Sequence, residues 1–85
     1  MVNTSDKNGL QTEVIAEIAT HLGVTPQDID VSAGLSDDLG LGPVEMADLI
    51  AAISQKFTVN FSASDLPRIK TVHDLVVTVE DLSLD

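Results

Sequence analysis

The side chains of this chain that could take part in catalysis are hydroxyl-bearing residues, acids and two histidines. Cysteine is absent. Nucleophilic catalysis needs a hydroxyl or thiol that a neighbouring base activates. His21 and His73 are far apart in the sequence, and neither belongs to a pattern with a partnered nucleophile. The absence of cysteine also excludes disulfides, thiolate metal sites and thiol catalysis. We therefore expect no catalytic residues and no enzyme activity.

Four aspartates between residues 28 and 38 could in principle hold a cation. Their spacing does not follow that of a calcium loop, and the central glycine that such a loop requires is missing. These aspartates are Asp28, Asp30, Asp37 and Asp38. We expect no specific metal site.

The most informative segment reads Asp-Asp-Leu-Gly-Leu-Gly-Pro-Val-Glu-Met over residues 37–46. Pro43 suits the first position of a helix, because its missing N–H would have no intrahelical partner there. Gly42 is then an acceptable N-cap, and Glu45 and Asp48 fall near the positive end of the helix dipole. The segment predicts a loop that ends where a helix begins at Pro43.

Three amphipathic segments predict the helices that position this junction. In the first, apolar residues recur every four positions, and the Gly23 that follows is typical of a helix end. The second segment starts at Pro43, and the third follows the capping pattern from Thr71 to Asp74. The three stripes are Leu10, Val14, Ile18 and Leu22; Leu49, Ile50, Ile53 and Phe57; and Val72, Leu75, Val76 and Val79.

Valines weaken the third helix, since β-branched side chains lower helix propensity. A strand is the competing interpretation there, but one strand without a partner would be unstable. Between the first two helices lies a long loop over residues 23–42, in which residues 25–28 predict a single short turn. The apolar residues expected to hold this loop against the core are Ile29, Val31, Leu35 and Leu39.

The remaining connection is expected to run extended over residues 58–61 and then to form a short helix. Ser62 to Asp65 has a capping pattern for that helix, and Pro67 should end it. The predicted fold is therefore all-α: a small up-down helical bundle of three main helices plus one short helix, with a long first loop. We assign residues 1–8 to a flexible N-terminal segment and residues 9–85 to a single domain.

Charge constrains the partners. Fourteen acids against four bases give a formal net charge of −10, which repels nucleic acid and anionic lipid and favours partners with basic surfaces. Solubility alone is the competing explanation of this charge. No apolar run approaches the ~20 residues of a membrane span, and the N-terminus lacks the order of a signal peptide. We expect a cytoplasmic monomer with neither nucleic acid nor membrane as partner.

Over residues 10–82 the chain resembles the acyl carrier protein family. The resemblance rests on Leu22-Gly23-Val24, Asp38-Leu39-Gly40, Phe57 and Ile69-Lys70-Thr71-Val72. In that family a loop reading Asp-Leu-Gly-x-Asp-Ser-Leu leads into the second helix, and its serine carries 4′-phosphopantetheine. Here Gly42, Pro43 and Val44 stand in place of Asp-Ser-Leu.

Proline has no hydroxyl, so we expect no cofactor at Pro43. Ser36, seven residues upstream, is a poor substitute because it lies in the loop and not at the start of the helix. The other serines considered are placed less well still, namely Ser32, Ser54, Ser62 and Ser64.

The resemblance also implies that the second helix is the docking surface for synthases, hydrolases and the phosphopantetheinyl transferase. We expect Leu41 to be exposed beside this surface and Met46 to pack in the core. Capping of the helix dipole is the alternative role of its acids. The predicted docking residues are Asp38, Leu41, Val44, Glu45 and Asp48, with Asp37 behind them.

The sequence thus predicts a carrier-protein-like module of fatty acid, polyketide or peptide synthesis. It would dock on partner enzymes without carrying 4′-phosphopantetheine at Pro43. Two alternatives stay open: a functional carrier with a variant attachment site, and a structural or regulatory interaction domain.

Overall fold

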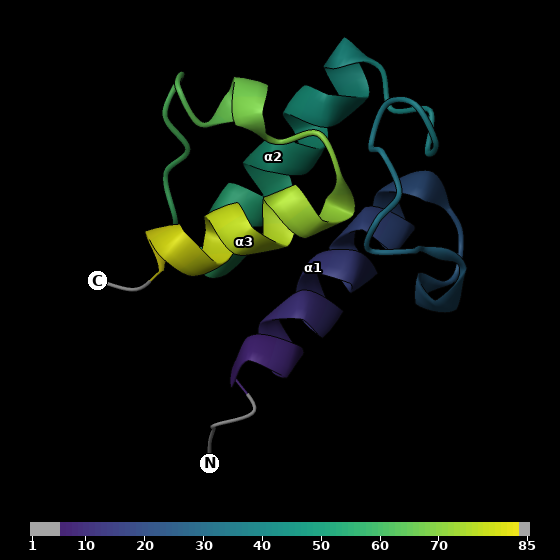
Figure 1. The fold of residues 1–85 in the computed structure, drawn as a ribbon, viewed down its shortest axis with the longest axis horizontal. Helices are drawn as coiled ribbons and strands as arrows, with labels where there is room; N and C mark the ends of the chain where they lie inside the picture. The colour runs from purple at the N-terminus through teal and green to yellow at the C-terminus, as the bar shows by residue number, and fades with distance from the viewer. Residues whose placement is uncertain (1–5, 84–85) are drawn as a thin grey trace.

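The computed structural model describes residues 6–83, and its architecture is a small bundle of three α-helices (Figure 1). These are α1 (Asp6–Leu22), α2 (Pro43–Phe57) and α3 (Val72–Leu82). Two 3-10 helices of three residues each lie in the connections, η1 (Pro26–Asp28) and η2 (Leu66–Arg68). The all-α bundle with a long first loop, predicted from the sequence, is confirmed.

The helix ends follow the local chemistry of the chain. α1 starts at Asp6, before the first apolar residue of its stripe, so residues 6–8 of the expected flexible segment are helical. Residues 1–5 lie outside the described part of the chain. At the other end Gly23 adopts a φ of +73° and donates its N–H to the Ala19 carbonyl at 2.8 Å. That is the left-handed glycine that commonly ends a helix.

α1 is the central element, because it packs against both α2 and α3. The three predicted stripes meet there and form the buried core. Burial of the α3 valines against α1 outweighs their low helix propensity, as tertiary packing commonly does. The predicted helix is therefore correct, and the alternative strand is wrong. The fully buried side chains include seven from these stripes, Val14, Ile18, Leu49, Ile53, Val72, Leu75 and Val79, together with Leu35 from the long loop.

The long loop is tied to the start of α3 by backbone hydrogen bonds. The Leu35 N–H donates to the Lys70 carbonyl at 2.8 Å, and the Val72 N–H donates to Ala33 at 3.0 Å. Ile29 and Leu35 are buried, while Val31 and Leu39 pack against the core from half-buried positions. The prediction that these side chains hold the loop against the core is confirmed.

The prediction for the second connection is wrong in its details. Pro67 does not end a short helix that begins at Ser62, but is the central residue of η2. A three-residue helix accommodates proline, because its first N–H groups have no intrahelical partner. The Ser62–Asp65 pattern forms a turn instead, in which the Asp65 carboxylate accepts from the Ser62 N–H at 2.9 Å.

The capping box at the start of α3 is present as predicted. The Thr71 hydroxyl accepts from the Asp74 N–H at 3.1 Å, and the Asp74 carboxylate accepts from the N–H groups of Lys70 and Thr71, both at 3.0 Å. These backbone donors, Lys70 first, hold the pKa of Asp74 below its usual value. The carboxylate therefore stabilises the fold above the ordinary aspartate pKa of ~3.9, and this contribution is lost as pH falls through the lowered value.

We expect Asp74→Asn to lower the free energy of unfolding at pH 7 by about 1 kcal/mol. The variant should also lose less stability than the parent protein when the pH falls from 5 to 2. Urea unfolding at a series of pH values measures both effects. Asp81→Asn, at an exposed position of the same helix, is the matched control. Equal pH dependence in the two variants would contradict this role of Asp74.

Candidate functional site at the start of the second helix

The loop before α2 is a compact turn built by its own backbone and by one aspartate. The Leu41 N–H donates to the Leu35 carbonyl at 3.0 Å, which closes the turn. Gly40 adopts a φ of +74° inside it. The Asp38 carboxylate accepts from the Gly34 N–H at 2.6 Å. The Asp38 carboxylate therefore stabilises the conformation of the loop through this hydrogen bond.

α2 begins as the sequence predicts, with Gly42 as N-cap and Pro43 as the first helical residue. The Met46 N–H donates to the Gly42 carbonyl at 2.8 Å. The Glu45 side chain folds back, and its Oε1 accepts from the Gly42 N–H at 3.1 Å. Glycine has no side chain with which to complete a capping box, so only the glutamate half of that motif exists here.

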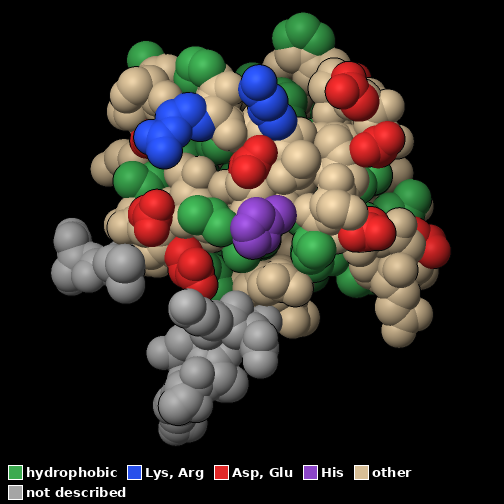
Figure 2. All heavy atoms as spheres, in the orientation of Figure 1, with side chains coloured by type: hydrophobic (Ala, Val, Ile, Leu, Met, Phe, Trp, Pro, Cys, Tyr) green, Lys and Arg blue, Asp and Glu red, His purple; other side chains and the backbone are tan. Residues whose placement is uncertain are grey.

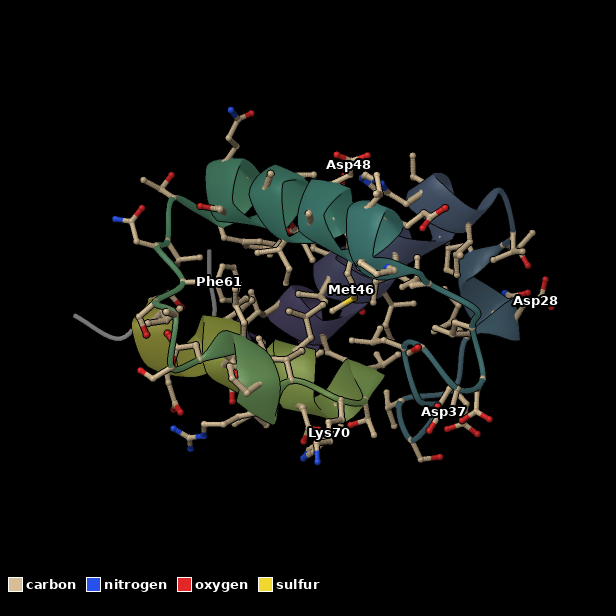
Figure 3. The ribbon with its side chains drawn as sticks, turned by 90° about the horizontal axis from the view of Figure 1, so that it is seen from above. Asp28, Asp37, Met46, Asp48, Phe61 and Lys70 are labelled. Atoms are coloured by element: carbon tan, nitrogen blue, oxygen red, sulfur yellow. The ribbon has the colours of Figure 1, made fainter. Side chains whose placement is uncertain are left out.

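The predicted docking residues divide into exposed and buried ones. Val44, Glu45 and Asp48 are exposed, and Val44 retains 71% of its accessible surface. Figure 3 shows Asp48 on the outer side of α2, pointing away from the bundle. Leu41 is only 3% exposed and belongs to the core, so its predicted exposure is wrong. The turn closed by the hydrogen bond between Leu41 and Leu35 directs the Leu41 side chain into the core. This burial follows from the geometry of the loop and could not be inferred from the residue type.

A pocket of about 820 Å³ lies on the inner side of α2, between this helix and residues 60–70. Met46 from α2 and Phe61 from the following segment point into the space between them (Figure 3). Three exposed residues also line the pocket: Ser36 and Asp37 from the preceding loop, and Pro43 at the start of α2. The pocket therefore opens beside the position that the resemblance assigns to the attachment serine.

Met46 is half-buried and packs against the core, in agreement with the prediction, but it also lines this pocket. The pocket does not follow from the sequence patterns described above. Neither do the residues that line it opposite α2, which include Phe61, Leu66 and Ile69. The available signal was the presence of large apolar residues in a connection that has no amphipathic period. Leu66 in particular remains 44% exposed.

The hydroxyl groups near α2 differ in availability. Ser36 is exposed and lines the same pocket as Pro43. Other serines use their hydroxyls locally: Ser32 donates to Asp30 at 2.9 Å, and Ser54 donates to the Val59 carbonyl. Of these serines, Ser36 has the exposed hydroxyl on the pocket that Pro43 also lines.

Two of the acids are engaged in local hydrogen bonds. Asp30 and Asp65 each accept hydrogen bonds from a nearby serine, which hold the pKa of each carboxyl below its usual value. Within the described residues no group of three or more histidines and acids is arranged to hold a metal ion. Figure 2 shows acidic side chains spread over the visible face.

None of the helices found over residues 6–83 combines the length and the apolar character needed to cross a membrane.

The back-folded Glu45 predicts a measurable contribution to helix stability. We expect Glu45→Ala to lower the free energy of unfolding by about 0.3–1 kcal/mol, because the variant loses both the bond to the Gly42 N–H and a charge at the positive end of the dipole. Asp48→Ala, exposed on the same helix, should change the stability less. Urea unfolding of both variants measures the difference, and equal effects would show that Glu45 does not cap α2.

Comparison with known proteins agrees with this geometry. The family described as "Phosphopantetheine attachment site" matches residues 12–79. The chain is 29% identical over 72 residues to an acyl carrier protein of Chlamydia trachomatis, a match that covers 85% of this chain and 94% of the relative. It is 33% identical over 69 residues to the acyl carrier protein of Thermotoga maritima, covering 81% and 85% of the two chains.

A similar fold occurs in the solution structure of the apo doublet acyl carrier protein from prodigiosin biosynthesis. The TM-score is 0.79 at 21% sequence identity, and the match covers all of this chain and 43% of the doublet. The three-helix bundle, the loop that leads into α2 and the match over residues 12–79 all lead to one conclusion: the chain belongs to the phosphopantetheine attachment site family, the family of the acyl carrier proteins.

Proposed function

We propose that this chain is a carrier-protein-like module that docks on enzymes of fatty acid, polyketide or peptide synthesis without bearing 4′-phosphopantetheine at position 43. The observation that carries the proposal is Pro43, the first residue of α2, in a chain whose family is defined by attachment of that group. A phosphodiester to the chain needs a hydroxyl oxygen, which the proline ring lacks. The residues at this position do not fit the group.

The outer side of α2 supports the docking half of the proposal. It combines the exposed apolar Val44 with the exposed carboxylates of Glu45 and Asp48. A surface of this kind complements a partner that presents an apolar patch among basic side chains. The net charge of −10 favours the same class of partner over nucleic acid or anionic lipid.

The local geometry supports the view that the start of α2 is adapted to its present residues. A Cβ added to Gly42 would lie 2.8 Å from the Glu45 Oε1, so an aspartate at position 42 would displace the glutamate from its cap. Gly42, Pro43 and Glu45 therefore form a consistent helix start. A module of this kind would act by occupying the carrier-binding surface of a partner enzyme, in competition with carriers that bear an arm.

The second candidate function is a working carrier loaded on Ser36. The observation that favours it is the position of Ser36, which is exposed and lines the same pocket as Pro43. It predicts a gain of mass that depends on this serine, whereas the armless module gains none.

Loading with coenzyme A and a promiscuous phosphopantetheinyl transferase separates these functions. We expect the mass of the unmodified chain to stay unchanged, because position 43 offers no hydroxyl. The double variant Gly42→Asp, Pro43→Ser should gain one phosphopantetheine. Intact-mass spectrometry measures both.

Ser36→Ala is the control for the second candidate. If the unmodified chain gains one phosphopantetheine and Ser36→Ala does not, the armless proposal is wrong and Ser36 is the attachment site. If even the double variant gains no mass, the transferase does not accept this fold, and the interaction-domain interpretation replaces both candidates.

The docking surface can be tested in the loadable double variant. We expect Asp48→Lys in that background to lower kcat/KM for loading by roughly tenfold, about 1.4 kcal/mol, because a basic partner surface would meet a like charge. Asp81→Lys, an equal charge reversal on the exposed side of α3, should leave the rate nearly unchanged. Equal losses in the two variants would contradict docking through α2.

A further inference from the structure

We propose that Asp38 and Asp74 form a clasp of two carboxylates across the junction between the first loop and α3, through which these two segments open and close as one unit. The clasp would exist in a chain that binds no partner, so it goes beyond the proposed function. Only its consequence rests on that function: opening would release the loop that fixes the start of α2, and with it the surface proposed for docking.

The junction contains an antiparallel β-bridge between Gly34 and Thr71. The hydrogen bonds donated by the Leu35 N–H and the Val72 N–H lie on either side of this bridge, one from each segment. Gly34 and Thr71 are therefore the non-hydrogen-bonded pair of an antiparallel ladder, in which the two residues do not bond to each other. Their own N–H groups point away from the opposite segment and need acceptors elsewhere.

Each of these two N–H groups is bound by an aspartate that follows it in the sequence. The Gly34 N–H donates to the Asp38 Oδ2 at 2.6 Å, and the Thr71 N–H donates to the Asp74 Oδ2 at 3.0 Å. Hydrogen bonds to an ionised carboxylate are roughly twice as strong as those between neutral groups. The two carboxylates therefore complete the hydrogen bonding of the bridge, one on each side of the junction.

The bonds of the junction run in both directions, so neither segment can detach alone. The loop donates through Leu35, whereas α3 donates the N–H groups of Val72 and His73, its first two residues, to carbonyls of the loop. These two N–H groups have no partner inside the helix, because the first turn of a helix leaves its donors free. Each carboxylate holds its own segment in the conformation that the other segment binds, so the loss of either one weakens every bond of the junction.

The unit extends to the start of α2. The Leu41 N–H donates to the Leu35 carbonyl at 3.0 Å, and Leu41 is buried immediately before the N-cap Gly42. Leu35 thus bonds to Lys70 through its N–H and to Leu41 through its carbonyl. When the loop detaches from α3, the position of Leu35 is no longer fixed, and the first turn of α2 loses its anchor.

Native-state hydrogen exchange of the free protein, followed by NMR, tests the proposal. We expect four amides of the junction to share one opening free energy, lower than that of amides in the helical core. Their exchange should also depend less steeply on urea, because a partial opening exposes less surface than complete unfolding does. The junction amides are those of Leu35, Leu41, Val72 and His73, and the core amides are those of Ile18 and Ile53.

Asp38→Ala should speed the exchange of all four junction amides by the same factor, roughly fivefold, because it removes one acceptor of the clasp. Asp74→Ala should do the same, and its effect should include the amides of the loop on the opposite side of the bridge. Asp37→Ala and Asp81→Ala remove exposed carboxylates from the same loop and from α3, and should leave these rates nearly unchanged.

Asparagine variants separate the hydrogen bond from the charge. Asp38→Asn and Asp74→Asn keep one acceptor oxygen, so they should speed exchange less than the alanine variants do. Asp74→Asn also replaces Asp74→Ala if the alanine variant does not fold. Asparagine variants that exchange as fast as the alanine variants would show that the charge acts alone, and the clasp would then be wrong.

Three further outcomes would overturn the proposal. The junction amides could exchange as slowly as the core amides, in which case the junction opens only when the whole protein unfolds. They could show two different opening free energies, one for the loop and one for α3. An alanine variant could also speed exchange only on its own side of the bridge. None of these measurements uses a partner enzyme, so their failure is distinct from failure of the loading experiment.

Discussion

The structure depends on the backbone hydrogen bonds that join the long first loop to Lys70 and to the first residues of α3. Leu35 donates to Lys70, Val72 donates to Ala33, and the His73 N–H donates to the Val31 carbonyl at 2.8 Å. Each bond joins residues that are more than thirty positions apart in the sequence, so together they fix the loop on the bundle. The same loop ends at Gly42, and its position therefore fixes where α2 begins.

This constraint explains why the proposed docking surface and the pocket both lie at the start of α2. Leu35 is buried where the loop is hydrogen-bonded to Lys70, and Leu41 is buried just before the N-cap of α2. Between them the turn holds Ser36 and Asp37 at the opening of the pocket. α2 then presents Met46 inward and Asp48 outward (Figure 3), so the same helix forms one wall of the pocket and carries the proposed docking residues.

Sequence reasoning recovered those parts of the structure that follow from local chemistry. The apolar stripes, Gly23, the Thr71–Asp74 capping box and Pro43 at the start of α2 each depend on residues within a few positions of one another. Leu41 was assigned wrongly because its burial depends on a turn closed by Leu35. The pocket escaped prediction because its walls come from the first loop, from α2 and from residues 60–70. The large apolar residues of the last segment indicate a contact with the core, but the sequence does not show the space that these walls leave between them.

Pro43 stands where the family has its attachment serine, and it is compatible with a regular start of α2. Proline satisfies the first helical position at least as well as serine would, because no N–H is needed there. The Glu45 side chain accepts from the Gly42 N–H, whereas glycine has no side chain that could accept from an N–H of the first helical turn. α2 thus begins at Pro43 with the glutamate half of a capping box, and the pocket lies beside this helix start. Covalent attachment at position 43 requires a hydroxyl, whereas docking requires only complementary shape and charge, so the proposed docking function does not depend on the attached group.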